Sequence, residues 1–178
     1  MHSPIGADIL EKIRRQRHIH VEMVCLGNIC RSPLAAAILA NRGGDRFKVS
    51  SSGTSGWHDG EAANRLSEKA WQEAGYEYHH ESRKFRTSFF VEADLILAMD
   101  LTNRANLLNA APSQEARAKV MMLRSFDPKL SHIDPTSRDA ELLQVPDPWG
   151  EDYESFIEVR LMLEEAITGL INTFGVQS

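Results

Sequence analysis

One stretch decides how this chain folds: Val24-Cys25-Leu26-Gly27-Asn28-Ile29-Cys30-Arg31-Ser32-Pro33. Apolar residues precede it, and a run of helix-forming residues, 34–40, follows Ser32 and Pro33. This order predicts a strand, a tight loop and a helix that begins at the serine and the proline. Gly27 and Asn28 are residue types that readily adopt left-handed backbone conformations, so we expect both to shape the loop.

The predicted loop is suited to binding an anion. At the N-terminal end of a helix, free backbone N–H groups and the positive end of the helix dipole attract negative charge. Arg31 adds a planar guanidinium that can bind two oxygens of a tetrahedral oxyanion, and the positive potential favours the thiolate form of Cys25. The sequence therefore predicts a nucleophile aimed at a bound oxyanion. The alternative is that Cys25 and Cys30 are small buried side chains and Arg31 is a surface residue.

Length and composition limit the possibilities. The chain has 178 residues, of which 42% are hydrophobic, enough for one well-filled domain. We expect residues 20–178 to form that domain and residues 1–19 to form an extension with a short amphipathic helix. The net charge of -5 argues against nucleic acid or a membrane surface as the main partner.

Location and redox state follow from two features of the sequence. We find no apolar run long enough to span a membrane and no apolar signal-peptide core at the N-terminus, so we expect a cytoplasmic protein. The two cysteines lie only five positions apart and offer no disulfide framework, which fits a reducing compartment.

Strands and helices alternate along the rest of the chain. The patterns predict strands over 20–25, 47–51, 94–99 and 118–123, and helices over 33–41, 61–74, 101–109 and 151–174. We expect residues 124–150 to be mostly loop, and Asp100 to cap the helix that follows it rather than to act in catalysis. Alternation of this kind predicts right-handed crossovers and an α/β fold with a parallel sheet covered on both faces.

Two further segments carry candidate functional residues. Trp57 lies in a loop of small polar residues, 52–60, and we interpret it as a wall for the ring of a substrate. Asp147 lies between two prolines and is followed by Trp149. On its own, this pattern fits an ordinary proline-rich turn as well as a rigidly held catalytic acid.

Three segments together resemble the low-molecular-weight protein tyrosine phosphatase family: the cysteine loop, residues 51–57 and the triplet 147–149. The resemblance covers about residues 20–174. It implies a four-stranded parallel sheet, doubly wound in the flavodoxin-like manner as three α/β/α layers, with the phosphate-binding loop after the first strand. The chain departs from the usual family pattern in its N-terminal extension, in having a single aromatic residue before Gly150, and in the long segment 124–145.

The resemblance also implies the site and the reaction. Cys25 would be the nucleophile, Arg31 the phosphate ligand and Asp147 the general acid and base, with a phosphocysteine intermediate and without a metal or other cofactor. Ser51 and His80 would support Asn28 from behind. The implied substrates are phosphotyrosine-containing proteins, the product is inorganic phosphate, and we expect a monomer or weak dimer. The residues implied to line the substrate and phosphate site are Leu26, Gly27, Asn28, Ile29, Cys30, Ser32, Trp57 and Trp149.

Other activities share this scaffold. Arsenate reductases need cysteines outside the loop, and none follows Cys30. Protein arginine phosphatases of the family carry threonine where this chain has Ile29, and an apolar residue there favours phosphotyrosine. A non-catalytic phosphotyrosine-binding module would be expected to lack Cys25 or Asp147. We also hypothesise a reversible Cys25–Cys30 disulfide that protects the nucleophile under peroxide, with simple packing of Cys30 as the alternative.

Overall fold

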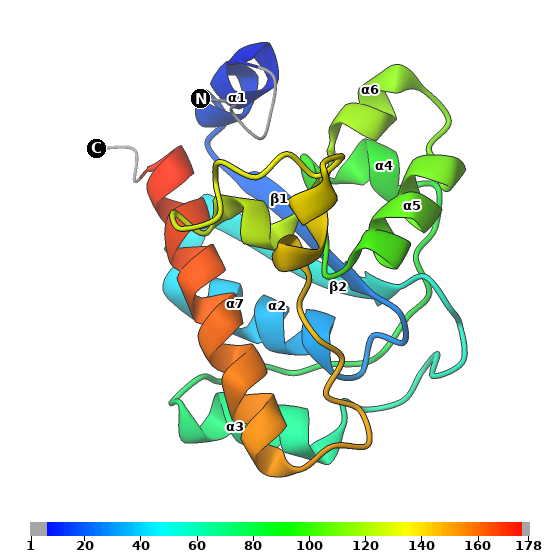
Figure 1. Ribbon diagram of the computed structural model, residues 1–178, viewed down its shortest axis with the longest axis vertical. Helices are drawn as coiled ribbons and strands as arrows, with labels where there is room; N and C mark the ends of the chain where they lie inside the picture. The colour runs from blue at the N-terminus through cyan, green and yellow to red at the C-terminus, as the bar shows by residue number, and fades with distance from the viewer. Residues whose placement is uncertain (1–6, 176–178) are drawn as a thin grey trace.

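A four-stranded parallel sheet forms the centre of the computed structural model, which describes residues 7–175 (Figure 1). The strands lie in the order β2-β1-β3-β4, with β1 in the middle and hydrogen-bonded to β2 and β3. This order confirms the predicted doubly wound, flavodoxin-like α/β fold. Its bounds are β1 (Ile19–Cys25), β2 (Phe47–Gly53), β3 (Leu95–Ala98) and β4 (Val120–Met122).

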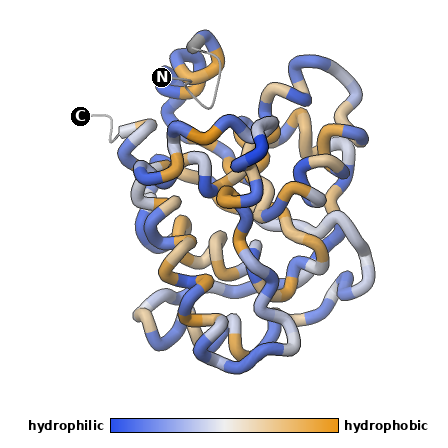
Figure 2. The backbone as a smooth tube through the Cα atoms, in the orientation of Figure 1, coloured by the Kyte–Doolittle hydropathy of each residue, from blue (hydrophilic) through white to orange (hydrophobic). Residues whose placement is uncertain are grey.

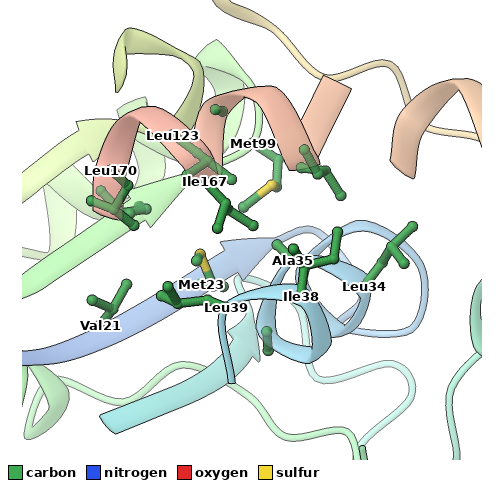
Figure 3. Close-up of a cluster of buried hydrophobic side chains, with 14 of the residues drawn as sticks. Val21, Met23, Leu34, Ala35, Ile38, Leu39, Met99, Leu123, Ile167 and Leu170 are labelled. Atoms are coloured by element: carbon green, nitrogen blue, oxygen red, sulfur yellow. The ribbon is translucent and has the colours of Figure 1, made fainter. Parts of the chain in front are cut away.

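Helices cover both faces of the sheet because alternate strand residues point to opposite sides. Val21 and Met23 of β1 face a core formed with α2 (Arg31–Arg42) and α7 (Tyr153–Phe174), against which α3 (Arg65–Glu73) also packs. Figure 3 shows Met23 directed toward Ile167 and Leu170 of α7. Along α7, hydrophobic residues alternate with hydrophilic ones, as expected for a helix with one buried side (Figure 2).

The opposite face has a second, smaller core. Val24 of β1 and Ile96 of β3 lie in it with residues of three helices. These helices are α4 (Phe89–Glu92), α5 (Leu101–Ala110) and α6 (Gln114–Ala118). None of the helices within residues 7–175 is long and apolar enough to cross a bilayer.

The N-terminal extension contains a helix, α1 (Ala7–Arg14), which packs against the C-terminal end of α7 (Figure 1). Ile13 is buried in the larger core. The Arg14 guanidinium donates two hydrogen bonds of 3.1 Å to Thr173 O near the end of α7. Because its last turn is attached to α7 in this way, the predicted amphipathic helix is part of the folded structure.

Several predicted boundaries are wrong. Helix α3 begins at Arg65 rather than at 61, because the Asn64 side chain caps it by accepting a hydrogen bond from Leu66 N at 2.9 Å. Strand β4 is shorter than predicted, since residue 118 ends α6 and residue 123 begins a short 3₁₀ helix, η2 (Leu123–Phe126). The segment 124–150 also contains η3 (Arg138–Leu143), and α4, α6 and the 3₁₀ helix η1 (Gly44–Arg46) were not predicted.

Candidate active site

The cysteine loop joins the end of β1 to the start of α2, at the carboxyl edge of the sheet. Cys25 is buried, and its Sγ atom lies 3.3 Å from Asn28 N, which donates to it, and 3.0 Å from Ser32 Oγ. Helix α2 begins at Arg31, so the prediction that Ser32 caps it is wrong. The Ser32 hydroxyl is turned inward instead, and its contact with the sulfur outweighs the local preference for capping.

Asn28 gives the loop its shape. Among residues 7–175 it is the only non-glycine residue with a positive φ, 56°. Its Nδ2 donates to Ser32 Oγ at 2.8 Å and to Ser51 Oγ at 3.0 Å, and its carbonyl oxygen accepts a 2.7 Å hydrogen bond from His80 Nε2. Ser51 and His80 therefore lie behind Asn28, where the resemblance placed them. Burial lowers the pKa of His80, with the hydrogen bond to Asn28 opposing this shift, so the ring is favoured in its neutral form.

Two glycines allow close approaches around the loop. Gly27 does not have the left-handed conformation expected of it. Its lack of a side chain makes room for His58 instead, because a Cβ atom there would lie 3.0 Å from His58 Cδ2. At Gly53, for which no role was predicted, a Cβ atom would lie 2.6 Å from Leu26 O. Glycine at that position lets the end of β2 contact the cysteine loop.

The side chain of Arg31 is almost fully buried, and its contacts hold it in one orientation. Its Nη1 donates to Asp100 Oδ2 at 2.8 Å and to Val145 O at 2.9 Å, and its Nη2 lies 3.6 Å from Asp147 Oδ2. Asp100 caps α5 as predicted, with Oδ1 accepting from Asn103 N at 2.7 Å. Its second contact, to Arg31, was not predicted from the sequence. The position of Asp100 directly after a buried strand, at the edge where such folds bind ligands, was the available signal.

A cleft of about 270 Å³ opens above the loop. Asn28, Ser32, Ser51 and His80 lie behind it rather than along its wall. Trp57 and Trp149 are 76% and 64% exposed at its rim. His58, which was not predicted as a site residue, also lines the cleft, and its Nδ1 lies 2.7 Å from Glu61 Oε2. The lining residues are Cys25, Leu26, Gly27, Ile29, Cys30, Arg31, Trp57, His58, Asp147 and Trp149.

The two thiols and the carboxylate differ in environment. Asp147 is partly exposed, and its Oδ1 accepts a 3.1 Å hydrogen bond from Trp149 N. Burial, followed by the charges of Asp147 and Cys25, raises the pKa of Cys30 to about 12, against a smaller opposing effect of Arg31. Cys30 is therefore a neutral thiol at physiological pH, which leaves Cys25 as the candidate nucleophile.

Taken together, the cleft combines a thiol, a buried guanidinium, loop amides and a carboxylate. This set can bind a tetrahedral oxyanion, attack its central atom and move a proton. Within residues 7–175, no three His, Cys, Asp or Glu side chains gather closely enough to hold a metal ion.

Comparisons with known proteins identify similar chains. A model of the family described as low molecular weight phosphotyrosine protein phosphatase matches residues 20–177. The low molecular weight protein-tyrosine-phosphatase of Streptomyces coelicolor is 39% identical over 153 residues, covering 83% of this chain and 88% of the relative. The low molecular weight protein-tyrosine phosphatase A of Mycobacterium tuberculosis is 38% identical over 157 residues, covering 85% and 89%.

Solved structures agree with these relatives. A protein tyrosine phosphatase from Entamoeba histolytica with Hepes in the active site superposes with a TM-score of 0.73 at 31% identity, covering 86% of this chain and 95% of that one. The YwlE arginine phosphatase from Geobacillus stearothermophilus superposes with a TM-score of 0.74 at 28% identity, covering 86% and 91%.

Proposed function

Because this chain belongs to the low-molecular-weight phosphotyrosine protein phosphatase family, we propose that it hydrolyses phosphotyrosine in proteins through a phosphocysteine intermediate. One observation carries the proposal. Cys25 and Arg31 begin and end the same loop, and both line one cleft with Asp147. A nucleophile, an oxyanion ligand and a proton donor therefore face the same space.

In the first step, the Cys25 thiolate attacks phosphorus in line with the tyrosyl oxygen. The S–P bond forms as the P–O bond breaks, and Asp147 gives its proton to the departing oxygen. Asp100 and Val145 accept hydrogen bonds from Nη1 of Arg31. Within residues 7–175, Nε and Nη2 make no hydrogen bond, and Nη2 has only the 3.6 Å ion pair with Asp147 Oδ2. Those two nitrogens form the edge that binds two phosphoryl oxygens side by side.

In the second step, water attacks phosphorus, Asp147 accepts its proton, and the S–P bond breaks to release inorganic phosphate. Ser32 favours this step. Its oxygen accepts from Asn28 Nδ2 at 2.8 Å, and Ser52 O lies 3.5 Å away as an alternative acceptor for its proton. Because a thiolate can only accept a hydrogen bond, Ser32 donates its proton to Cys25 Sγ at 3.0 Å when the thiolate forms. A hydrogen bond from Ser32 stabilises the departing thiolate.

The cleft favours an aromatic leaving group. Ile29 and Leu26 line it, and the two exposed tryptophans at its rim can contact a phenyl ring. Phosphoarginine is the second candidate substrate, because a solved arginine phosphatase has the same fold. A binding module without catalysis would bind phosphotyrosine peptide and release no phosphate.

The proposal is tested by measuring phosphate release in the presence of a chelator from three peptides that differ only at the phosphorylated residue, which is phosphotyrosine, phosphoserine or phosphoarginine. We expect the phosphotyrosine peptide to be hydrolysed fastest and Cys25→Ser to abolish release. If the phosphoarginine peptide is hydrolysed faster than the phosphotyrosine peptide, phosphoarginine replaces phosphotyrosine as the assigned substrate. Full activity in Cys25→Ser would overturn the mechanism.

A further inference from the structure

A buried carboxylate lies in the sheet close to the cysteine loop. Glu22, on β1 and three residues before Cys25, is only 1% exposed. Its oxygens accept hydrogen bonds from Arg83 Nη2 at 3.2 and 3.1 Å and from Ser50 Oγ, and His20 Nε2 lies 4.0 Å away. A buried charge is very unfavourable unless it is paired, so Glu22 strongly constrains where Arg83 can lie.

The Arg83 side chain is fixed at two further points. Its Nε donates to Ser51 O at 3.0 Å, and its guanidinium carbon lies 4.2 Å from the centre of the Phe89 ring. The planar guanidinium thus connects β1, β2 and the start of α4. Lysine could supply a charge at this position but not this set of directed contacts.

The backbone of Arg83 and the side chain of its neighbour Ser82 contact the cysteine loop directly. Arg83 N donates to Asn28 Oδ1 at 3.0 Å, and Ser82 Oγ donates to Asn28 O at 2.7 Å. Arg83 O also accepts from Gly53 N at 2.9 Å. Asn28 has a positive φ, a conformation that persists in a non-glycine residue only when the surroundings enforce it.

We propose that Glu22 is a positioning residue for the reaction, which anchors Arg83 so that residues 82–83 hold Asn28 and the cysteine loop in their anion-binding conformation. The connection runs from Glu22 to Arg83, from Arg83 to Asn28, and from Asn28 through Ser32 to the sulfur of Cys25. This inference rests on the proposed function, since it assigns the loop its role in binding phosphate. It adds a residue that lies outside the cleft and does not contact the substrate.

Two substitutions test the positioning role of Glu22. Glu22→Gln keeps the shape of the side chain but removes its charge. Arg83→Lys keeps a charge but removes the guanidinium, whose Nη2 contacts both oxygens of Glu22 while its Nε contacts Ser51 O. The affinity for inorganic tungstate, measured by calorimetry, reports on the loop without requiring catalysis. We expect each variant to bind tungstate about tenfold more weakly and to lose about tenfold in kcat/KM, as a displaced loop would produce. Because both variants break one contact, the double variant should be no worse than the more severe single variant.

Glu164→Gln is the matched control. It removes the carboxylate of an ion pair on α7, in which Glu164 Oε1 lies 2.9 Å from Arg160 Nη1. This variant should have a lower melting temperature and an unchanged affinity for tungstate. If both test variants bind tungstate within about twofold of the parent protein, or if their effects add in the double variant, the proposal is wrong whatever happens to the melting temperature. If Glu22→Gln does not fold, the tungstate affinity of Arg83→Lys alone decides whether the proposal holds. A parent protein that binds tungstate without hydrolysing phosphotyrosine would contradict the proposed function and leave this test valid.

Discussion

Arg31 Nη1 donates a 2.8 Å hydrogen bond to Asp100 Oδ2, joining the start of α2 to the carboxyl end of β3. The other oxygen of the same carboxylate accepts from Asn103 N and caps α5. A single aspartate therefore orients the guanidinium of the cleft and caps the start of a helix. Because Arg31 is only 2% exposed, it has little freedom to find another orientation if this contact is lost.

Replacing Asp100 by two different residues separates these roles. Asparagine is as good a helix cap as aspartate, so Asp100→Asn should keep its stability while kcat/KM falls about tenfold from loss of the charged hydrogen bond. Asp100→Ala should lose about 1 kcal/mol of stability as well. Steady-state kinetics and thermal unfolding measure the two effects. A normal kcat/KM in Asp100→Asn would show that Arg31 does not depend on this contact.

The role of Asp147 predicts a dependence on the leaving group. Asp147→Asn should lower kcat for a phosphotyrosine peptide by about 100-fold or more, because the tyrosyl oxygen then departs without a proton. With dinitrophenyl phosphate, whose leaving group needs no proton, the loss should be much smaller. Equal losses with both substrates would exclude proton donation by Asp147.

The exposed tryptophans should contribute to substrate binding and little to folding. Trp57→Ala and Trp149→Ala should each raise KM for aryl phosphates by about three- to tenfold, because a ring contact is lost. Their free energies of unfolding should stay within about 0.5 kcal/mol of the parent value, since both side chains are mostly exposed. Kinetics with phenyl and small alkyl phosphates provides the comparison. An unchanged ratio of the two KM values would argue against a ring-binding role.

His80 makes stability depend on pH in the acid range. Burial lowers the pKa of His80 below its ordinary value of 6.5, so the unfolded chain binds a proton more readily than the folded protein. This contribution to stability is complete above pH 6.5 and is lost as the pH falls below it. Urea unfolding between pH 7 and about pH 5 should show a smaller slope of stability against pH in His80→Gln. Identical slopes would contradict the assignment.

Cys30 predicts a redox response that depends on pH. Peroxide oxidises the Cys25 thiolate to a sulfenic acid, and the Cys30 sulfur can then form the S–S bond with loss of water. Because the pKa of Cys30 is raised to about 12, disulfide formation should be slow at neutral pH and faster as pH rises. The fraction of activity that a reductant restores after peroxide treatment measures how much of the disulfide has formed. Equal recovery in Cys30→Ser would mean that Cys30 only packs beneath the loop.

The central features of the fold were predictable because their signals are local. A strand, a Gly-Asn loop and a run of helix formers follow one another directly between residues 20 and 40. Alternating strands and helices then restrict the topology to a parallel sheet. Even here a local rule failed at Ser32, whose hydroxyl contacts Cys25 and Asn28 instead of capping the helix.

The contacts that support the site were not predictable in the same way. Asp100 lies 69 positions from Arg31, and Arg83 lies 61 positions from Glu22. Their pairing depends on the register of β1 with its neighbours and on the path of residues 78–90, which have no strong periodicity. His58 was missed because its role depends on the space above Gly27, which appears only after the loop has folded.

The phosphocysteine intermediate is tested most directly by quenching the enzyme in acid during turnover of a phosphotyrosine peptide and locating the phosphoryl group by mass spectrometry. We predict that a phosphoryl group is found on the peptide containing Cys25 and that it is absent from Cys25→Ser. A phosphoryl group on another side chain, or hydrolysis by Cys25→Ser at the parent rate, would contradict this account.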